Sequence, residues 1–428
     1  KLASTTLLEA LDLAKVDQGW SVPRAGQSVS GKPLTVGGRA FTTGLGTHAP
    51  SELIIDLKGR SVRFSAEVGI DSGSDYPGAA VFEVIGDGRS LWKSPLLKRG
   101  DLPLACQVSL KGAKVLQLKV SDAGDMSGDH ANWADAVLEW EGRAPEAIDI
   151  LPSRRGFINP AKRWHDAQGG LIQAHGGGVL FHKGTYYWYG EERTHGYFNK
   201  TGVAVYSSKD LVKWKKEAIA MPSASFPEQF RDAGVCERPK VIYNKKTRKF
   251  VMWSHLDANG YRVSQAGIAM ADKPTGPFVH VKNYQPIPGE TYRDMNLFQD
   301  DDGSAYAFYS SENNATMYIL RLSEDYLSHV EPAIEGRTWA KAFAKGWREA
   351  PAPFKHEGRY YVVTSGCTGW DPNEAQIASA DHPLGPWKVL GNPMRGHRGD
   401  KTFGGQSTYV LPVQGRKGEF IFMADRWC

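Results

Sequence analysis

A chain of 428 residues is longer than one ordinary core and suits two domains. The net charge of +5 comes from 52 basic and 47 acidic residues spread along the chain, and the absence of a Lys/Arg block argues against a nucleic-acid partner. No segment approaches the roughly 18 apolar residues of a membrane span, and the four cysteines form no CxxC pair that would indicate zinc. The start at Lys1, without an apolar leader, is typical of a processed exported protein and predicts a secreted, extracellular or periplasmic location.

The first part of the chain has the pattern of a β-sandwich. Short alternating segments at residues 51–57, 62–68, 80–85 and 115–120 are separated by turns. The alternation stops where Pro145 and Pro152 appear. We therefore predict a β-sandwich (jelly roll) over residues 1–143 and a linker over 144–155.

The rest of the chain, residues 156–428, contains an internal repeat. A polar turn followed by an aromatic-rich segment recurs at intervals of about 55 to 63 residues. The five copies are residues 182–190, 244–253, 300–309, 355–363 and 416–423. A second turn follows the first four copies, at residues 207–214, 271–278, 323–329 and 380–387. Repeats without helical connectors predict an all-β, five-bladed β-propeller, because a solenoid normally has shorter repeats.

Polar residues precede each repeated hairpin, where the inner strands of a propeller would converge. They are Gln173 and His175, Glu237, Arg293 and Asp294, Glu349, and Gln406. A buried unpaired carboxylate costs several kcal/mol, so a salt bridge such as Glu237 with Arg238 is one explanation. The other is a site, because glycoside hydrolysis needs a protonated acid and a second group that handles water.

The motifs of this second part resemble glycoside hydrolase family 43, and within it the exo-β-1,3-galactanase branch. The matching segments are residues 172–178, 186–191, 237–241, 293–302, 349–351, 368–370, 406 and 425–427. The resemblance implies an exo-acting, inverting enzyme that releases galactose from the non-reducing ends of β-1,3-galactan. Related branches share several motifs, so an α-L-arabinofuranosidase or a β-galactofuranosidase is the first alternative. A non-catalytic galactose-binding lectin is the second, although a lectin has no need for an acid such as Glu349 beside Glu237.

The same resemblance implies roles for individual residues. Glu349 would be the general acid, and Glu237 would orient it and tune its pKa. The terminal sugar would be held by Glu191, Asp294, Tyr261, Asn313, Thr368, Trp370 and His175. No metal ion or cofactor is expected in the catalytic site, and the substrate is expected to be a polysaccharide or oligosaccharide bound by a monomer.

The group that activates water is unusual. Most family 43 members place an Asp base on the first blade, where this chain has Gln173 and His175. In the galactanase branch, Gln406 would take this role, as an imidic acid tautomer, although a neutral amide is a very poor base. Asp166 and Glu191 are the alternative bases.

The first part resembles the NPCBM type of carbohydrate-binding module, also called family 51. The matching segments are residues 44–51, 63–67, 82–88 and 129–135. The resemblance implies galactose binding or a passive spacer, with His48 and Trp133 either in a sugar site or in the core. Acidic loops at residues 71–75 and 122–129 are candidates for a structural Ca²⁺ ion, with solvated turns as the alternative. Because the chain ends at Cys428, soon after residues 425–427, we expect a fifth blade that is either incomplete or closed by the segment after the linker.

Overall fold

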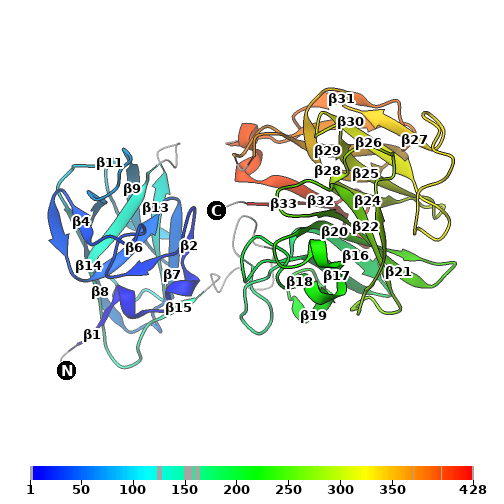
Figure 1. Ribbon diagram of the computed structural model, residues 1–428. Coiled ribbons are helices and arrows are strands. Elements are labelled where there is room, and N and C mark those ends of the chain that lie inside the picture. Colours follow the sequence, from blue (N-terminus) through cyan, green and yellow to red (C-terminus); the bar gives the residue numbers. More distant parts are fainter. Residues whose placement is uncertain are drawn as a thin grey trace. The chain divides into compact units, whose positions relative to one another are not determined.

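The computed structural model describes residues 3–122, 128–148, 158, 160, 164–369, 371–396 and 398–426. The chain divides into two compact units, residues 1–163 and 164–427 (Figure 1). Both are built from antiparallel strands, and the helical segments in the described ranges are 3-10 turns of three to six residues. None of these turns has the length or apolar character needed to span a membrane. The all-β prediction is therefore confirmed.

In its described residues, the first unit is a β-sandwich of two main sheets around a large apolar core, with a smaller apolar cluster beside β4 (Leu34–Val36). The first sheet runs β12 (Leu104–Ser109), β8 (Ser61–Ile70), β14 (His130–Trp140), β6 (Gly44–His48) and β3 (Arg24–Ala25), with β1 (Ser4–Leu7) also on β14. The second runs β10 (Arg89–Lys93), β9 (Ala79–Gly86), β13 (Val115–Asp122), β7 (Ser51–Asp56) and β15 (Glu146–Ile148), with β11 (Leu97–Lys98) on β9 and β2 (Asp17–Gln18) on β7. A hairpin of β4 (Leu34–Val36) and β5 (Arg39–Phe41) and the turns η1 (Leu8–Ala10) and η2 (Leu13–Lys15) complete the described part.

Two residues singled out in this unit are buried. Trp133 is 1% exposed and packs edge-on against Phe64 and Phe82, with ring centroids 5.9 and 5.1 Å away. His48 is 4% exposed, and its Nδ1 lies 2.7 Å from the carbonyl oxygen of Ala49. Trp133 is therefore a core residue.

The sandwich extends further along the chain than predicted. Residues Glu146–Ile148, placed in the linker by the prolines, form β15, which pairs with β7 so that Ile148 lies opposite Ile54. Ile148 is 9% exposed, so burial of its side chain outweighs the turn signal of Pro145. Residues 149–155 of the predicted linker lie outside the described ranges.

Within its described residues, the second unit contains four four-stranded sheets and one two-stranded sheet. The first two sheets contain β16 (His175–His182), β17 (Thr185–Glu192), β18 (Gly202–Ser208) and β19 (Lys215–Pro222), and β20 (Val235–Asn244), β21 (Lys249–Asp257), β22 (Gln265–Ala271) and β23 (Val279–Tyr284). The next two contain β24 (Arg293–Gln299), β25 (Ala305–Ser311), β26 (Thr316–Arg321) and β27 (Trp339–Ala342), and β28 (Arg348–His356), β29 (Arg359–Gly366), β30 (Gln376–Ala380) and β31 (Lys388–Gly391). The two-stranded sheet contains β32 (Gln406–Pro412) and β33 (Phe420–Asp425). The turns η4 (Ser223–Ser225), η5 (Glu228–Phe230) and η6 (Gly399–Gly404) lie between them.

The repeat seen in the sequence corresponds to these sheets. Each of the five copies forms the hairpin between the first and second strand of a sheet, and the second turn connects the third and fourth strands of the first four sheets. The first strands contact one another in the order β16, β20, β24, β28 and β32, and β32 contacts β16. The starts of these five strands therefore face a common region.

Candidate active site

A β-bulge near the start of each first strand directs polar side chains into that common region. The bulges lie between His175 and Gly178, Glu237 and Lys240, Arg293 and Met295, Glu349 and Ala352, and Ser407 and Tyr409. Strand alternation alone would send neighbouring side chains to opposite faces, whereas the extra residue of a bulge changes their direction. Arg238 and Asp294, with φ values of 50° and 33°, sit in the bulges, and each lines the same pocket as the residue before it.

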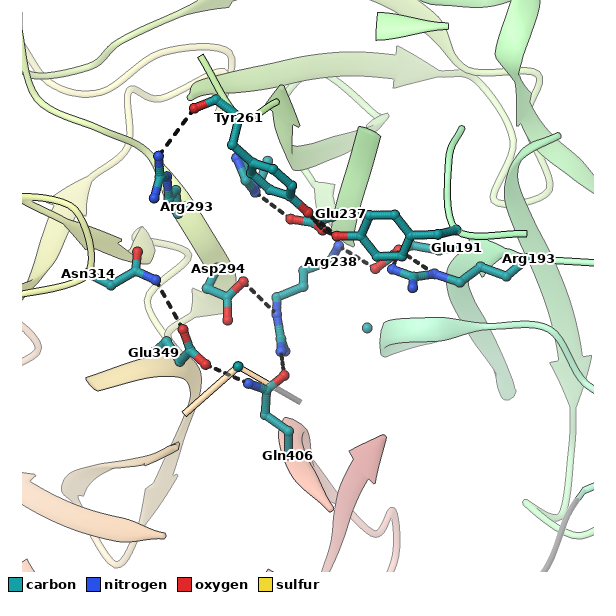
Figure 2. A pocket seen from close by; sticks show the side chains of 14 residues that line it. Glu191, Arg193, Glu237, Arg238, Tyr261, Arg293, Asp294, Asn314, Glu349 and Gln406 are labelled. Atoms are coloured by element: carbon teal, nitrogen blue, oxygen red, sulfur yellow. Dashed lines mark hydrogen bonds and ion pairs between the residues drawn. The ribbon is translucent and has the colours of Figure 1, made fainter. Parts of the chain in front are cut away.

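The pocket has a volume of about 330 Å³, at the small end of ligand sites. Its walls come from all five sheets (Figure 2). The lining residues are Gly176, Glu191, Arg193, Tyr197, Glu237, Arg238, His255, Tyr261, Arg293, Asp294, Asn314, Glu349, Gly369 and Gln406.

Two glycines in β16 leave space for the charged side chains. A Cβ at Gly176, whose φ is 57°, would lie 2.4 Å from an oxygen of Glu191. A Cβ at Gly178 would lie 2.5 Å from Cδ of Lys240. Lys240 is 2% exposed and donates to the carbonyl oxygens of Gly176 (2.5 Å) and Arg238 (3.3 Å), which ties two bulges together.

Glu349 has the properties of a general acid. Its Oε2 accepts from Nδ2 of Asn314 at 3.0 Å, and its Oε1 accepts from Nε2 of Gln406 at 2.8 Å. Burial, followed by the nearby charge of Asp294, raises the pKa of Glu349 to about 8, although Arg238 opposes the shift. The carboxyl group is therefore mainly protonated at neutral pH.

The carboxylate that tunes Glu349 is Asp294, which differs from the sequence-based prediction. Glu237 was expected in this role, but it is not among the leading causes of the raised pKa of Glu349. Nor does Glu237 pair with Arg238, because Nε of Arg238 forms an ion pair with Asp294 at 3.2 Å. The bulge of β20 turns the guanidinium away from Glu237, a change that residue spacing does not reveal.

Glu237 is held by three donors. Its Oε1 accepts from the hydroxyl groups of Tyr197 and Tyr261, and its Oε2 lies 2.8 Å from Nδ1 of His255. Burial of the phenol raises the pKa of Tyr261, so this hydroxyl keeps its proton. Glu237 therefore has a fixed orientation at the pocket wall.

Glu191 is more deeply enclosed. It is 6% exposed, and its Oε2 accepts from Nε of Arg193 at 2.9 Å while its Oε1 accepts from the backbone N–H of Arg238 at 3.0 Å. Burial raises the pKa of Glu191 despite the opposing charge of Arg193. Figure 2 shows Glu191 on the opposite side of Arg238 from Glu349.

Gln406 connects Arg238 to the acid. Nη2 of Arg238 donates to Oε1 of Gln406, and Nε2 of Gln406 donates to Glu349. A guanidinium only donates, so the oxygen facing it must accept, which favours the amide over an imidic acid that carries its proton on that oxygen. The contacts describe a group that orients the acid.

The other predicted site residues lie elsewhere. Nε2 of His175 lies 2.9 Å from Oε1 of Gln173, and neither residue lines the pocket. Asp166 accepts hydrogen bonds from two backbone N–H groups at 2.9 Å within its own turn. It does not line the pocket, so its position does not suit a base. Thr368 accepts from Nδ2 of Asn373 at 2.7 Å, while its neighbour Gly369 lines the pocket. Trp370 lies outside the described residues.

Asn313 was predicted to be in the site, but its neighbour Asn314 lines the pocket instead. Asn313 is exposed, whereas Asn314 lines the pocket and contacts Glu349. Arg193, Tyr197 and Asn314, like Tyr261, lie in the loops that follow the second strand of a sheet. That shared position is the signal that would have found them.

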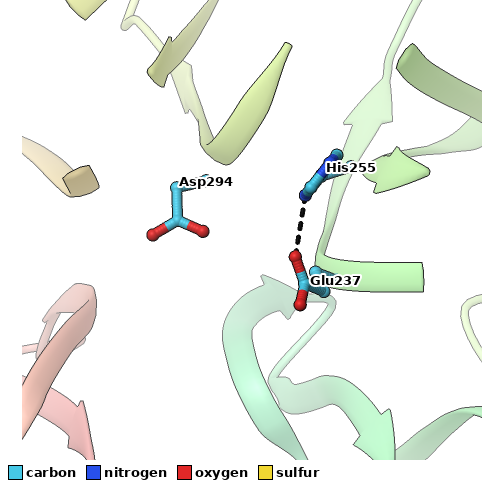
Figure 3. A group of neighbouring side chains, drawn as sticks. All are labelled: Glu237, His255 and Asp294. Carbon is cyan, nitrogen blue, oxygen red and sulfur yellow. Dashed lines mark hydrogen bonds and ion pairs between the residues drawn. The ribbon is translucent and has the colours of Figure 1, made fainter. Parts of the chain in front are cut away.

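Glu237, His255 and Asp294 have side-chain atoms within 4.8 Å of one another, a spacing that suits a metal ion (Figure 3). Burial alone would lower the pKa of His255, but contacts with Asp257 and Glu237 raise it to about 9. A protonated ring has no lone pair for a metal, and Asp294 is already paired with Arg238. The charges present therefore favour a network of hydrogen bonds over a bound cation.

In the first unit, the ammonium group of Lys32 contacts the acidic loop at residues 71–75. Nζ of Lys32 lies 2.9 Å from the carbonyl oxygen of Gly73 and 3.3 Å from Oδ2 of Asp75. Residues 123–127 of the other acidic loop lie outside the described ranges. A structural Ca²⁺ ion stays a prediction.

Comparisons with known proteins match both parts of the chain to known families. The sequence profile of glycosyl hydrolases family 43 matches residues 178–416, which include Glu191, Glu237, Asp294, Glu349 and Gln406. The chain belongs to glycosyl hydrolases family 43. The profile of the NPCBM/NEW2 domain matches residues 4–139 of this family 43 protein, so both resemblances seen in the sequence are confirmed.

Solved structures of family 43 enzymes are similar to the second unit. A β-1,3-galactosidase solved with galactodeoxynojirimycin is 43% identical, with a TM-score of 0.59 over 63% of this chain and 91% of that chain. An exo-β-1,3-galactanase from Clostridium thermocellum is 36% identical, with a TM-score of 0.58 over 64% of this chain and 59% of that one.

The first two curated relatives are longer than this chain. An α-1,3-galactosidase B of Akkermansia muciniphila is 30% identical over 182 residues, 39% of this chain and 22% of that protein. The chain spans 7% and 22% of the lengths of the first two curated relatives that it matches.

Proposed function

We propose that this protein is an exo-acting, inverting glycoside hydrolase that releases galactose from the non-reducing ends of β-1,3-galactan. The observation that carries the proposal is the raised pKa of Glu349, about 8, in a pocket of about 330 Å³. A carboxyl group that stays protonated at neutral pH can donate its proton to a glycosidic oxygen. The likeness to β-1,3-galactosidases and galactanases supports galactose as the sugar released.

In this mechanism, Glu349 gives its proton to the leaving oxygen as the bond to the sugar breaks. Asn314 and Gln406 hold the carboxyl group in place, and the charge of Asp294 delays its ionisation. Glu237 would accept hydrogen bonds from hydroxyl groups of the terminal sugar. The small volume of the pocket suits one terminal residue, which is the reason for exo action.

The proposal must also name the residue that acts as the general base and activates the water. Inversion needs acid and base about 6.5 to 9.5 Å apart, so that a water fits beside the sugar. Gln406 contacts the acid at 2.8 Å, whereas Glu191 lies across Arg238 and has a raised pKa, as a base that works near neutral pH requires. We therefore favour Glu191 over Gln406 as the base.

The proposal extends to the whole chain. The closed order of contacts among β16, β20, β24, β28 and β32 supports a five-bladed β-propeller whose central end carries the pocket. The NPCBM domain would bind the galactose-containing polysaccharide, and the protein would act outside the cell as a monomer without a cofactor.

Product analysis tests this function. Debranched β-1,3-galactan and aryl β-galactopyranoside, α-arabinofuranoside and β-galactofuranoside are compared for wild type, Glu349→Gln and Gln406→Ala. Release of single galactose units from the galactan, with loss of at least about a thousandfold in Glu349→Gln, is expected. Release only from a furanoside would assign the enzyme to the arabinofuranosidase or galactofuranosidase branch, and binding without release would indicate a lectin.

A further inference from the structure

Asp257 is a buried carboxylate that the proposed mechanism does not use. It lies at the end of β21, is 0% exposed and does not line the pocket. Its Oδ1 accepts from the backbone N–H groups of Ala258 (3.0 Å) and Val263 (2.7 Å), and its Oδ2 accepts from Oγ of Ser264 (2.8 Å). Burial alone would raise the pKa of Asp257, but these contacts and that with His255 lower it to about 2. It is therefore charged at every working pH.

The contacts of Asp257 shape the loop of residues 258–264. This loop carries Tyr261, which has a φ of 54°, and Ser264, which has a φ of 47°. Both are left-handed conformations that a side chain adopts only when its surroundings hold it there. Arg293 secures the outer side through Oγ of Ser264 (3.1 Å) and the carbonyl oxygen of Tyr261 (3.4 Å). The tyrosine thereby reaches Glu237.

The same carboxylate also acts on His255. Oδ2 of Asp257 lies 3.4 Å from Nε2 of the ring, and the opposite nitrogen, Nδ1, lies 2.8 Å from Glu237. His255 is 1% exposed, and its raised pKa of about 9 depends on Asp257 and Glu237. The other ionisable groups that face it are Asp294, with an oxygen within 4.8 Å, and Tyr261, whose ring centroid is 6.0 Å away.

We propose that Asp257 is a positioning residue for the glycosidase reaction, because it sets two of the donors that hold Glu237, the His255 ring and the Tyr261 hydroxyl. The inference rests on the proposed function, in which Glu237 binds the terminal sugar. One buried charge thus fixes both the conformation of a loop and the protonation state of a histidine.

Asp257→Asn separates these two effects. The amide oxygen can still accept from Ala258 and Val263, so the loop is retained, but the negative charge beside His255 is lost. The amide N–H₂ facing Nε2 favours the neutral ring and lowers the pKa of His255, but that ring carries its proton on Nδ1 and still donates to Glu237. Asp257→Asn should therefore keep KM near the wild-type value. Asp257→Ala removes the acceptor for Val263 and Ser264, so Tyr261 loses its position beside Glu237 and KM should rise by about tenfold.

A double variant shows whether the effect passes through Glu237. Glu237→Gln already lacks the carboxylate that the His255 and Tyr261 donors hold, so Asp257→Ala should raise KM less in that background than in the wild type. The matched control is Asp210→Ala. Asp210 also organises a turn, by accepting from Val212 (2.9 Å) and Lys213 (2.8 Å), and its variant should keep the wild-type KM. An unchanged KM in Asp257→Ala, or an equal rise in both backgrounds, would overturn the proposal.

Histidine NMR gives a readout that does not depend on the substrate. The resonances assigned to His255, by their loss in His255→Gln, should not titrate below about pH 8 in wild type and should titrate at least one pH unit lower in Asp257→Asn. A wild-type ring that titrates near pH 6.5 overturns the proposal even where a variant fails to fold. If no glycoside is cleaved, the proposed function fails, while this titration still decides whether Asp257 controls His255.

Discussion

Burial and the charge of Asp294 together should set the alkaline limit of activity, and the part that Asp294 contributes can be removed by substitution. Glu349 must be protonated to act, so kcat/KM falls as pH rises through its pKa of about 8. Asp294→Asn removes the negative charge that raises this pKa and leaves Arg238, which lowers it, without its ion-pair partner. Both changes lower the pKa of Glu349 and move the limb to lower pH.

A nearby charge shifts a pKa by about 1 to 3, so the limb should move from about pH 8 to about pH 7 or below. With a shift of one, the protonated fraction at pH 8.5 falls from roughly one quarter to roughly 3%, an approximately eightfold loss beyond any change in the plateau. The assay is kcat/KM for a β-1,3-galactooligosaccharide between pH 4 and 10. Glu237→Gln is the control in the same pocket, because it should lower the plateau without moving the limb. A limb that stays in place in Asp294→Asn, or moves equally in Glu237→Gln, refutes the reasoning.

Three further outcomes are expected. Because the pKa of Glu349 is raised from 4.5 to about 8, the wild type has the full stability from this group below pH 4.5 and loses it as pH rises through 8. Urea unfolding at pH 5 and pH 9 measures how far the free energy of unfolding falls between these two values. Glu349→Gln cannot ionise, so this fall should be smaller in the variant than in the wild type by up to about 4 kcal/mol, and an equal fall in both proteins would contradict the raised pKa of Glu349. Gly178→Ala should destabilise by about 1 to 3 kcal/mol in the same assay, since its Cβ meets Cδ of buried Lys240 at 2.5 Å, and an unchanged midpoint would show that the lysine can move. With azide as an external nucleophile, Glu191→Ala should regain activity and form an α-galactosyl azide, and recovery in Gln406→Ala instead would assign the base to the amide.

The repeat was readable from the sequence because each copy is a local hairpin. Its polar turn and aromatic strand recur at nearly constant spacing, so the five hairpins and the residues before them could be predicted without knowing their neighbours. Glu349, Glu237 and Gln406 were found in this way, and all three line the pocket. The resemblance of their motifs to family 43 was confirmed by the match over residues 178–416.

Other features of the structure could not be predicted from the sequence pattern. Asn314 rather than Asn313 reaches Glu349, because the choice between adjacent residues in a turn depends on backbone angles. The strand Glu146–Ile148 was hidden by Pro145, since its partner β7 is distant in the chain.

The sequence by itself determined the all-β class, the two units and the residues that could carry charge into the pocket, because these follow from local alternation, turn residues and repeated spacing. Only the tertiary structure decided which charges meet. Arg238 lies beside Glu237 in the chain but pairs with Asp294, which belongs to the next sheet. Asp294 in turn adds to the effect of burial in raising the pKa of Glu349, which belongs to the sheet that follows. Electrostatic energies depend on distance and burial in space, and the bulges that set both are stabilised by contacts between sheets.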